Sequence, residues 1–200
     1  MQDQDQHTGK DQKKALSRKA LWRMFAFFLV AFGGWSLVML GKPYGVAHIR
    51  EYSGGLGLVD TTINYTVGQV YQLMDQLGQA GRAAYGRFVL LDLVYIVIYM
   101  IFLGVGLNLF MRELGLSGSR IYAWRMLPVY AGMADFGEEL SLLAILGNYP
   151  DRLDGVVEFM NLFTLAKLAL FSLSVLILAV LVIRWLMLRV FTNRKAASSG

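Results

Sequence analysis

Residues 132–146 read GMADFGEELSLLAIL, and this stretch decides the fold because it places Asp135, Glu138 and Glu139 among residues typical of a membrane-spanning helix. On an insertion scale each charged, unpartnered carboxylate near the helix centre costs roughly 2.5–3.5 kcal/mol. The segment would therefore insert poorly by itself. Its other residues are mostly apolar, so we interpret residues 122–146 as a span that depends on neighbouring helices.

Three further apolar segments, residues 24–41, 88–110 and 159–183, are each long enough to cross a hydrocarbon core of about 30 Å at about 1.5 Å per residue. The composition agrees, with 56% hydrophobic residues, 13% aromatic residues and a mean hydropathy of +0.48. The sequence thus predicts an all-α integral membrane protein, a four-helix bundle within a membrane domain of residues 21–190.

Charges in the connections predict the orientation. The N-terminal tail through Arg23 holds six Lys or Arg against three Asp, and the chain from Arg184 onward holds four positive residues and no acid. The loop of residues 147–158 has one Arg against three acids. By the positive-inside rule we expect a multi-pass protein of the cell (inner) membrane with both termini cytoplasmic. Residues 1–20 and 191–200 are expected to be disordered tails.

The long outer loop between the first two spans contains a helical pattern at residues 66–79. Thr66 followed by Gln69 fits a capping box. Apolar residues then recur at helical spacing opposite Gln72 and Asp75, which predicts an additional amphipathic helix. This helix either packs on the outer face or covers a pocket.

Ionisable residues of three spans converge in depth. Asp92, Glu138, Lys167 and Asp135 are expected roughly 6, 12, 12 and 17 Å below the outer boundary, on inward stripes of their helices. Buried charges of this kind suggest a functional site. The candidate catalytic residues are Asp92, Asp135, Glu138 and Lys167, and the candidate binding residues are Arg82, Tyr85, Tyr95, Tyr99, Glu139, Asn161 and Thr164.

Four acids surround a single buried ammonium in this arrangement, so at least one carboxyl group should hold a proton or face a positively charged ligand. Glu139 has a second interpretation, in which it faces a neighbouring chain. A further alternative for the whole set of buried charges is that they have only a structural role and fix how the helices pack.

The elements LMDQLGQAGRAAYGRFVLLD, DFGEEL and FTLAK resemble those of small bacterial four-span membrane proteins. In that pattern a G-R-x-x-Y element precedes an intramembrane Asp, and a D-x-x-E element and a Lys follow in later spans. The resemblance extends from about residue 60 to residue 171 and implies the fold but no activity. The matching positions here are Gly81, Arg82, Tyr85, Asp92, Asp135, Glu138 and Lys167.

Several classes of site are not expected. The chain has no cysteine and only two histidines, far apart, which argues against disulfides, thiol catalysis and a histidine-built metal centre, and we expect neither metal nor cofactor. The basic tails are expected to meet membrane lipids and not nucleic acid.

Three functions remain open. The first is binding or conversion of a lipophilic or amphiphilic small molecule by acid–base chemistry, as in an isomerase or cyclase. The second is proton- or cation-coupled transport of a small solute, for which a homodimer could supply the path through the apolar inner half. The third is a structural or assembly role.

Overall fold

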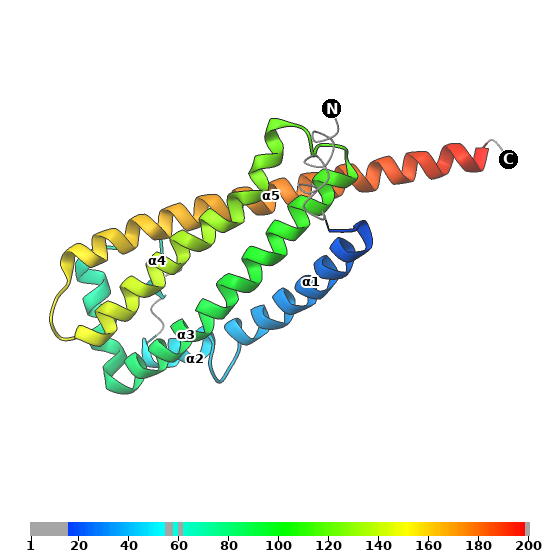
Figure 1. Cartoon of the computed structure of the whole chain (residues 1–200). Coiled ribbons are helices and arrows are strands. Elements are labelled where there is room, and N and C mark those ends of the chain that lie inside the picture. The colour runs from blue at the N-terminus through cyan, green and yellow to red at the C-terminus, as the bar shows by residue number, and fades with distance from the viewer. Residues whose placement is uncertain (1–15, 55–57, 60–61, 199–200) are drawn as a thin grey trace, which may run out of the picture.

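The computed structural model describes residues 16–54, 58–59 and 62–198, and every regular element in these residues is helical (Figure 1). The predicted all-α class is therefore confirmed for this part of the chain. The elements are α1 (Arg18–Leu40), α2 (Val46–Tyr52), α3 (Val67–Glu113), the short 3-10 helix η2 (Arg120–Met126), α4 (Leu127–Asn148) and α5 (Asp154–Ser198).

The four long helices lie side by side and alternate in direction along the chain (Figure 1). Helix α3 contacts α1, α4 and α5, and α4 packs along α5. Helix α5 continues past the other helices toward the C-terminus (Figure 1). Residues contributed by α3, α4 and α5 can therefore meet in the interior.

The helical pattern at residues 66–79 forms the beginning of α3. Both hydrogen bonds of the capping box between Thr66 and Gln69 are present. Met74 and Leu77 are buried whereas Gln72 and Asp75 are exposed. The helix is interrupted at Gly78, whose φ of 58° lies in the left-handed region that favours glycine. Beyond this kink α3 continues to Glu113.

The segment with the three acids begins later as an α-helix than the sequence pattern predicted. Residues 120–126 form the 3-10 helix η2, and α4 starts at Leu127. Pro128 lies in the first turn of α4, where its missing N–H breaks no intrahelical hydrogen bond. Tyr122 and Arg125 consequently belong to the connection before α4.

Three helices, α1, α3 and α5, are long and apolar enough to cross a membrane, which is consistent with a membrane protein. Of the predicted disordered tails, residues 1–15 and 199–200 lie outside the described residues. Helix α1 begins at Arg18, and α5 remains helical to Ser198, beyond residue 191 where a tail was expected.

Buried apolar side chains form two clusters at opposite ends of the helices. The first cluster includes Met74, Tyr85, Val89, Leu142 and Met160. The second includes Ile96, Leu103, Phe110, Ala131 and Leu178. Each of α3, α4 and α5 contributes to both clusters, so each helix has a short stretch that lies between them.

Candidate functional site

The buried polar residues occupy the stretch between the two apolar clusters on each of three helices. On α3, Asp92 lies between Val89 of one cluster and Ile96 of the other. On α4, Asp135 and Glu138 lie between residues 131 and 142, and on α5 Thr164 and Lys167 follow Met160. The apolar packing therefore encloses the polar residues from both ends.

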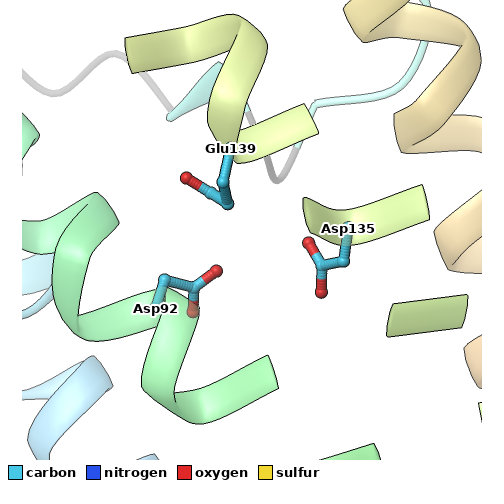
Figure 2. A group of neighbouring side chains, drawn as sticks. All are labelled: Asp92, Asp135 and Glu139. Carbon is cyan, nitrogen blue, oxygen red and sulfur yellow. The ribbon is translucent and has the colours of Figure 1, made fainter. Parts of the chain in front are cut away.

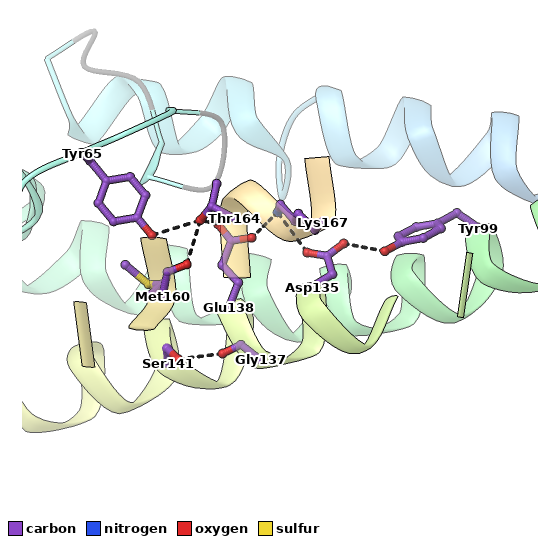
Figure 3. Close-up of polar contacts among 9 residues, drawn as sticks. All are labelled: Tyr65, Tyr99, Asp135, Gly137, Glu138, Ser141, Met160, Thr164 and Lys167. Carbon is purple, nitrogen blue, oxygen red and sulfur yellow. Dashed lines mark hydrogen bonds and ion pairs between the residues drawn. The ribbon is translucent and has the colours of Figure 1, made fainter. Parts of the chain in front are cut away.

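Lys167 connects two carboxylates of α4. Its Nζ lies 2.9 Å from Asp135 Oδ1 and 2.5 Å from Glu138 Oε2 (Figure 3). The side chains of all three residues are at most 12% exposed, so water screens these charges weakly. Tyr99 of α3 donates to the other Asp135 oxygen at 2.8 Å. One carboxylate thus joins three helices.

A hydroxyl network holds Glu138 from the other side. Thr164 Oγ1 lies 2.6 Å from Glu138 Oε1, 3.0 Å from the Met160 carbonyl oxygen and 3.0 Å from the Tyr65 hydroxyl (Figure 3). A threonine hydroxyl has one proton and two lone pairs, so it donates to one of these oxygens and accepts from another group. Thr164 thereby ties Glu138 to Tyr65, which lies just before α3.

A cavity of about 250 Å³ opens beside this network. The Asp135 and Lys167 side chains form part of its polar wall, and the Tyr95 hydroxyl lies 3.0 Å from Ser36 Oγ of α1. The Tyr99 ring meets the Phe171 ring edge to face at 5.1 Å. The cavity is lined by Asp92, Tyr95, Tyr99, Asp135, Lys167, Leu168 and Phe171.

Three carboxylates of the site approach one another closely. Asp92, Asp135 and Glu139 each have an oxygen within 4.8 Å of the others, and all three residues are buried (Figure 2). Carboxylate oxygens at this spacing suit a hard cation such as Ca²⁺ or Mg²⁺, or a proton shared between acids. The expectation of no metal rested on the absence of cysteine and on the two distant histidines, whereas this cluster consists of carboxylates.

The structure brings most of the sequence-derived candidates together. Asp92, Asp135, Glu138, Lys167, Tyr95, Tyr99, Thr164 and Glu139 lie in the network or around the cavity. Arg82 lies elsewhere, donating to the Met74 carbonyl at 2.8 Å and stacking on the Tyr149 ring at 4.0 Å. Tyr85 is fully buried in the first apolar cluster, and Asn161 donates to the Tyr65 carbonyl at 3.4 Å.

Two findings change the sequence interpretation at single residues. Glu139 has no exposed surface and lies among the acids of its own chain, so it does not face a neighbouring chain. Tyr65 was missed as a partner of Thr164 because it lies in an irregular loop, where helical spacing carries no information. Leu168 and Phe171 follow Lys167 on α5 by one and four residues, and their side chains complete the cavity wall.

Comparison of the chain with known protein families, curated proteins and solved structures found no match. The chemistry of the site therefore follows from its own residues.

Proposed function

We propose that the chain is a four-span membrane protein whose enclosed carboxylate–lysine–tyrosine site binds, and converts by acid–base chemistry, an amphiphilic molecule. Helix α4 serves as the fourth span, with the additional helix at the start of α3 on the outer side. Its acids all point inward, whereas Tyr130, Met133 and Leu140 are 56–63% exposed and suit contact with lipid. The buried Lys167 offsets the cost of burying Asp135 and Glu138.

The observation that carries this proposal is a cavity lined by carboxylates, a lysine and tyrosines that shares one lining residue, Phe171, with an apolar groove. The cavity of about 250 Å³ is smaller than the roughly 300–1,000 Å³ of pockets that hold a whole ligand. It therefore suits a head group. The groove, about 500 Å³ in volume, is lined by Phe32, Phe102, Leu103, Phe171, Val175, Leu178, Ala179, Val182 and Ile183. These side chains are all apolar and suit a hydrocarbon tail.

The charges favour a head group that is cationic or can donate a proton. Asp92, Asp135, Glu138 and Glu139 supply four carboxyl groups around the single ammonium of Lys167. A carboxylate that faces the cavity, Asp92 or Asp135, can accept a proton from a bound molecule. The Lys167 ammonium and the Tyr99 hydroxyl can then stabilise negative charge that develops on it. In an isomerisation, the carboxyl group that has accepted the proton returns it to a different atom of the same molecule, so the step balances without a further reactant. In a cyclisation, the same proton transfers accompany formation of the ring bond at the expense of a double bond.

The apolar cluster below the site favours binding over conduction. Proton- or cation-coupled transport needs polar groups toward both faces. Between the site and the end of the helices that carries Arg18 and Arg189, the buried side chains include Ile96, Leu103 and Leu178. The polar groups there besides tyrosine are few: Ser174 donates to the Leu170 carbonyl, and Asn108 accepts from Tyr122. A solute would therefore have to cross a mostly apolar layer.

Dodecylamine is the probe that tests the proposal, because it combines a compact cationic head with a single alkyl tail. We expect wild-type protein in nanodiscs to bind it above the level of empty nanodiscs. Asp135→Asn should weaken this binding at least about tenfold, as expected for loss of a charged hydrogen bond. Glu51→Gln, which removes an exposed carboxylate outside the site, is the matched control.

Dodecanoate, with the same tail and an anionic head, should not bind above empty nanodiscs. Equal affinity of wild type and Asp135→Asn for dodecylamine would contradict the proposal. Thermal unfolding of the variant confirms that a loss of binding does not come from a loss of fold, and Asp92→Asn provides a second test at the cavity wall.

A further inference from the structure

A second cavity, about 640 Å³ in volume, lies at the opposite end of the helices from α2 and belongs to none of the chemistry above. It is formed by the start of α1 and the C-terminal part of α5. Its lining residues are Arg18, Lys19, Trp22, Arg23, Trp185 and Arg189. Four cations and two indole rings thus surround one space.

The floor of this basic cavity is aromatic and well packed. The Trp22 and Trp185 rings lie 5.4 Å apart, and each lies 5.6 Å from the ring of Phe110 on α3. The Trp185 indole N–H donates to Glu113 Oε2 at 3.3 Å. Tryptophan is enriched where a span meets the head-group layer of a membrane. The floor therefore places the cavity at such a boundary.

The cavity has more positive than negative charge. Glu113 is the acid at its edge, forming an ion pair with Arg18 and lying 4.0 Å from Arg189 Nη2. Four cations beside this one carboxylate leave an excess of three positive charges. The side chains of Arg18 and Arg189 are 63% and 54% exposed, and Lys19 and Arg23 are also exposed. The first turn of α1 contains no acid, so the positive end of its helix dipole adds to this field.

We propose that this basic cavity binds the phosphate head group of an anionic phospholipid. Arginine and lysine side chains from two helices can surround a phosphate from several directions, and arginine forms paired hydrogen bonds with its oxygens. Phe27, one turn after Arg23 on α1, is exposed and would contact the acyl chains. The proposal requires α1 and α5 to lie in a membrane and is independent of the acid–base site.

The test measures binding of phosphatidylglycerol and phosphatidylcholine to the detergent-solubilised protein by native mass spectrometry. Wild type should bind phosphatidylglycerol more tightly than phosphatidylcholine. Lys19→Gln/Arg23→Gln removes two exposed cations of the basic cavity, and at about fivefold per cation it should weaken phosphatidylglycerol binding about 25-fold. Arg50→Gln/Arg87→Gln removes two exposed cations outside the basic cavity and is the matched control.

The control variant should bind phosphatidylglycerol as wild type does. Equal losses in the two double variants would overturn the proposal, because they would show attraction to total charge and not to a site. Unchanged binding in Lys19→Gln/Arg23→Gln would also overturn it. Millimolar glycerol 3-phosphate should not displace the lipid. Displacement would show that the cavity recognises a free phosphate and not a membrane lipid.

Discussion

Replacing Lys167 by a neutral residue should lower the stability of the folded protein. Its ammonium lies between Asp135 and Glu138, which are 7% and 1% exposed and three residues apart on α4. Removing the cation leaves two buried carboxylates without their nearby positive charge. Such a loss is more costly than the pair itself is favourable, because the desolvation penalty of the acids remains.

We expect Lys167→Met to lower the free energy of unfolding by about 3 kcal/mol, at the lower end of the range for breaking a buried ion pair. Asp135→Asn in the same chain should restore part of this loss, since it removes one of the two buried charges. Thermal unfolding in detergent measures both effects. Lys42→Met, which removes an exposed lysine, should leave stability unchanged.

The double variant also separates function from structure. If the network only fixes helix packing, Lys167→Met/Asp135→Asn should fold and show the same dodecylamine binding as wild type. The proposed function requires the double variant to fold but to lose this binding. Stability equal to wild type in Lys167→Met alone would show that the ion pairs do not stabilise the folded state.

At the scale of single residues, the sequence was informative where helical spacing and membrane depth apply. Asp92, Tyr95 and Tyr99 share a helical face by spacing, and the structure has all three lining the same cavity. Spacing could not place Arg82, because its partners Met74 and Tyr149 depend on the kink at Gly78 and on a loop.

At the scale of elements, the approach of α4 to α5 sets the geometry of the site. A Cβ atom at Gly137 of α4 would lie 2.9 Å from atoms of the Phe163 ring on α5, one turn before Lys167. Glycine at this position therefore allows the two helices to come close enough for Lys167 to reach Asp135 and Glu138.

We predict that Gly137→Val lowers the free energy of unfolding by about 1–3 kcal/mol, because the added carbons overpack the contact with Phe163. It should also weaken dodecylamine binding, since a shift of α4 moves Asp135 out of its place in the cavity wall. Thermal unfolding and nanodisc binding measure the two effects. Gly147→Val is the control on the same helix, where nothing lies within 4 Å of the added Cβ. A neutral Gly137→Val would show that α4 and α5 can separate without consequence.

Element boundaries show what a sequence pattern can and cannot specify. Thr66 and Gln69 predicted the start of a helix because capping is local chemistry, and the structure has both hydrogen bonds. The pattern predicted a helix at residues 66–79, and the backbone at Gly78 is non-helical, so α3 consists of two helical parts that meet at a kink there. Helix α2 has only seven residues, too few for a periodic pattern to reveal it.

At the scale of the whole molecule, the order of the helices makes α4 the decisive element. Helices α1, α3 and α5 are each apolar enough to cross a membrane, whereas α4 carries the acids. If α4 crosses as well, the ends of α3 and α4 lie on opposite sides of the membrane. If it does not cross, they lie on the same side. Whether α4 is a fourth span can therefore be tested by finding the side of the membrane on which the loops after α3 and after α4 lie.

The chain contains no cysteine, so single-cysteine variants report on one position each. Ser119 lies before η2, and Asp151 lies between α4 and α5. Both residues are exposed, so the variants Ser119→Cys and Asp151→Cys each present one reactive thiol. We predict that a membrane-impermeant maleimide labels Asp151→Cys in intact cells and labels Ser119→Cys only after permeabilisation. Tyr44→Cys, in the exposed turn after α1, should behave like Asp151→Cys.

The contacts that build the site also give the physical reason why α4 could cross the membrane. By itself α4 would have to bring three carboxylates into hydrocarbon, at roughly 7–10 kcal/mol if all are charged and unpartnered. Packed against α3 and α5, it presents Asp135 and Glu138 to Lys167, Tyr99 and Thr164, whereas Tyr130, Met133 and Leu140 are its large exposed side chains. Lys167→Met should therefore also decrease labelling of Asp151→Cys in intact cells if insertion of α4 depends on the ammonium, because residue 151 would then stay on the cytoplasmic side with residue 119. Labelling of Ser119→Cys and Asp151→Cys from the same side in the wild-type background would exclude α4 as a span.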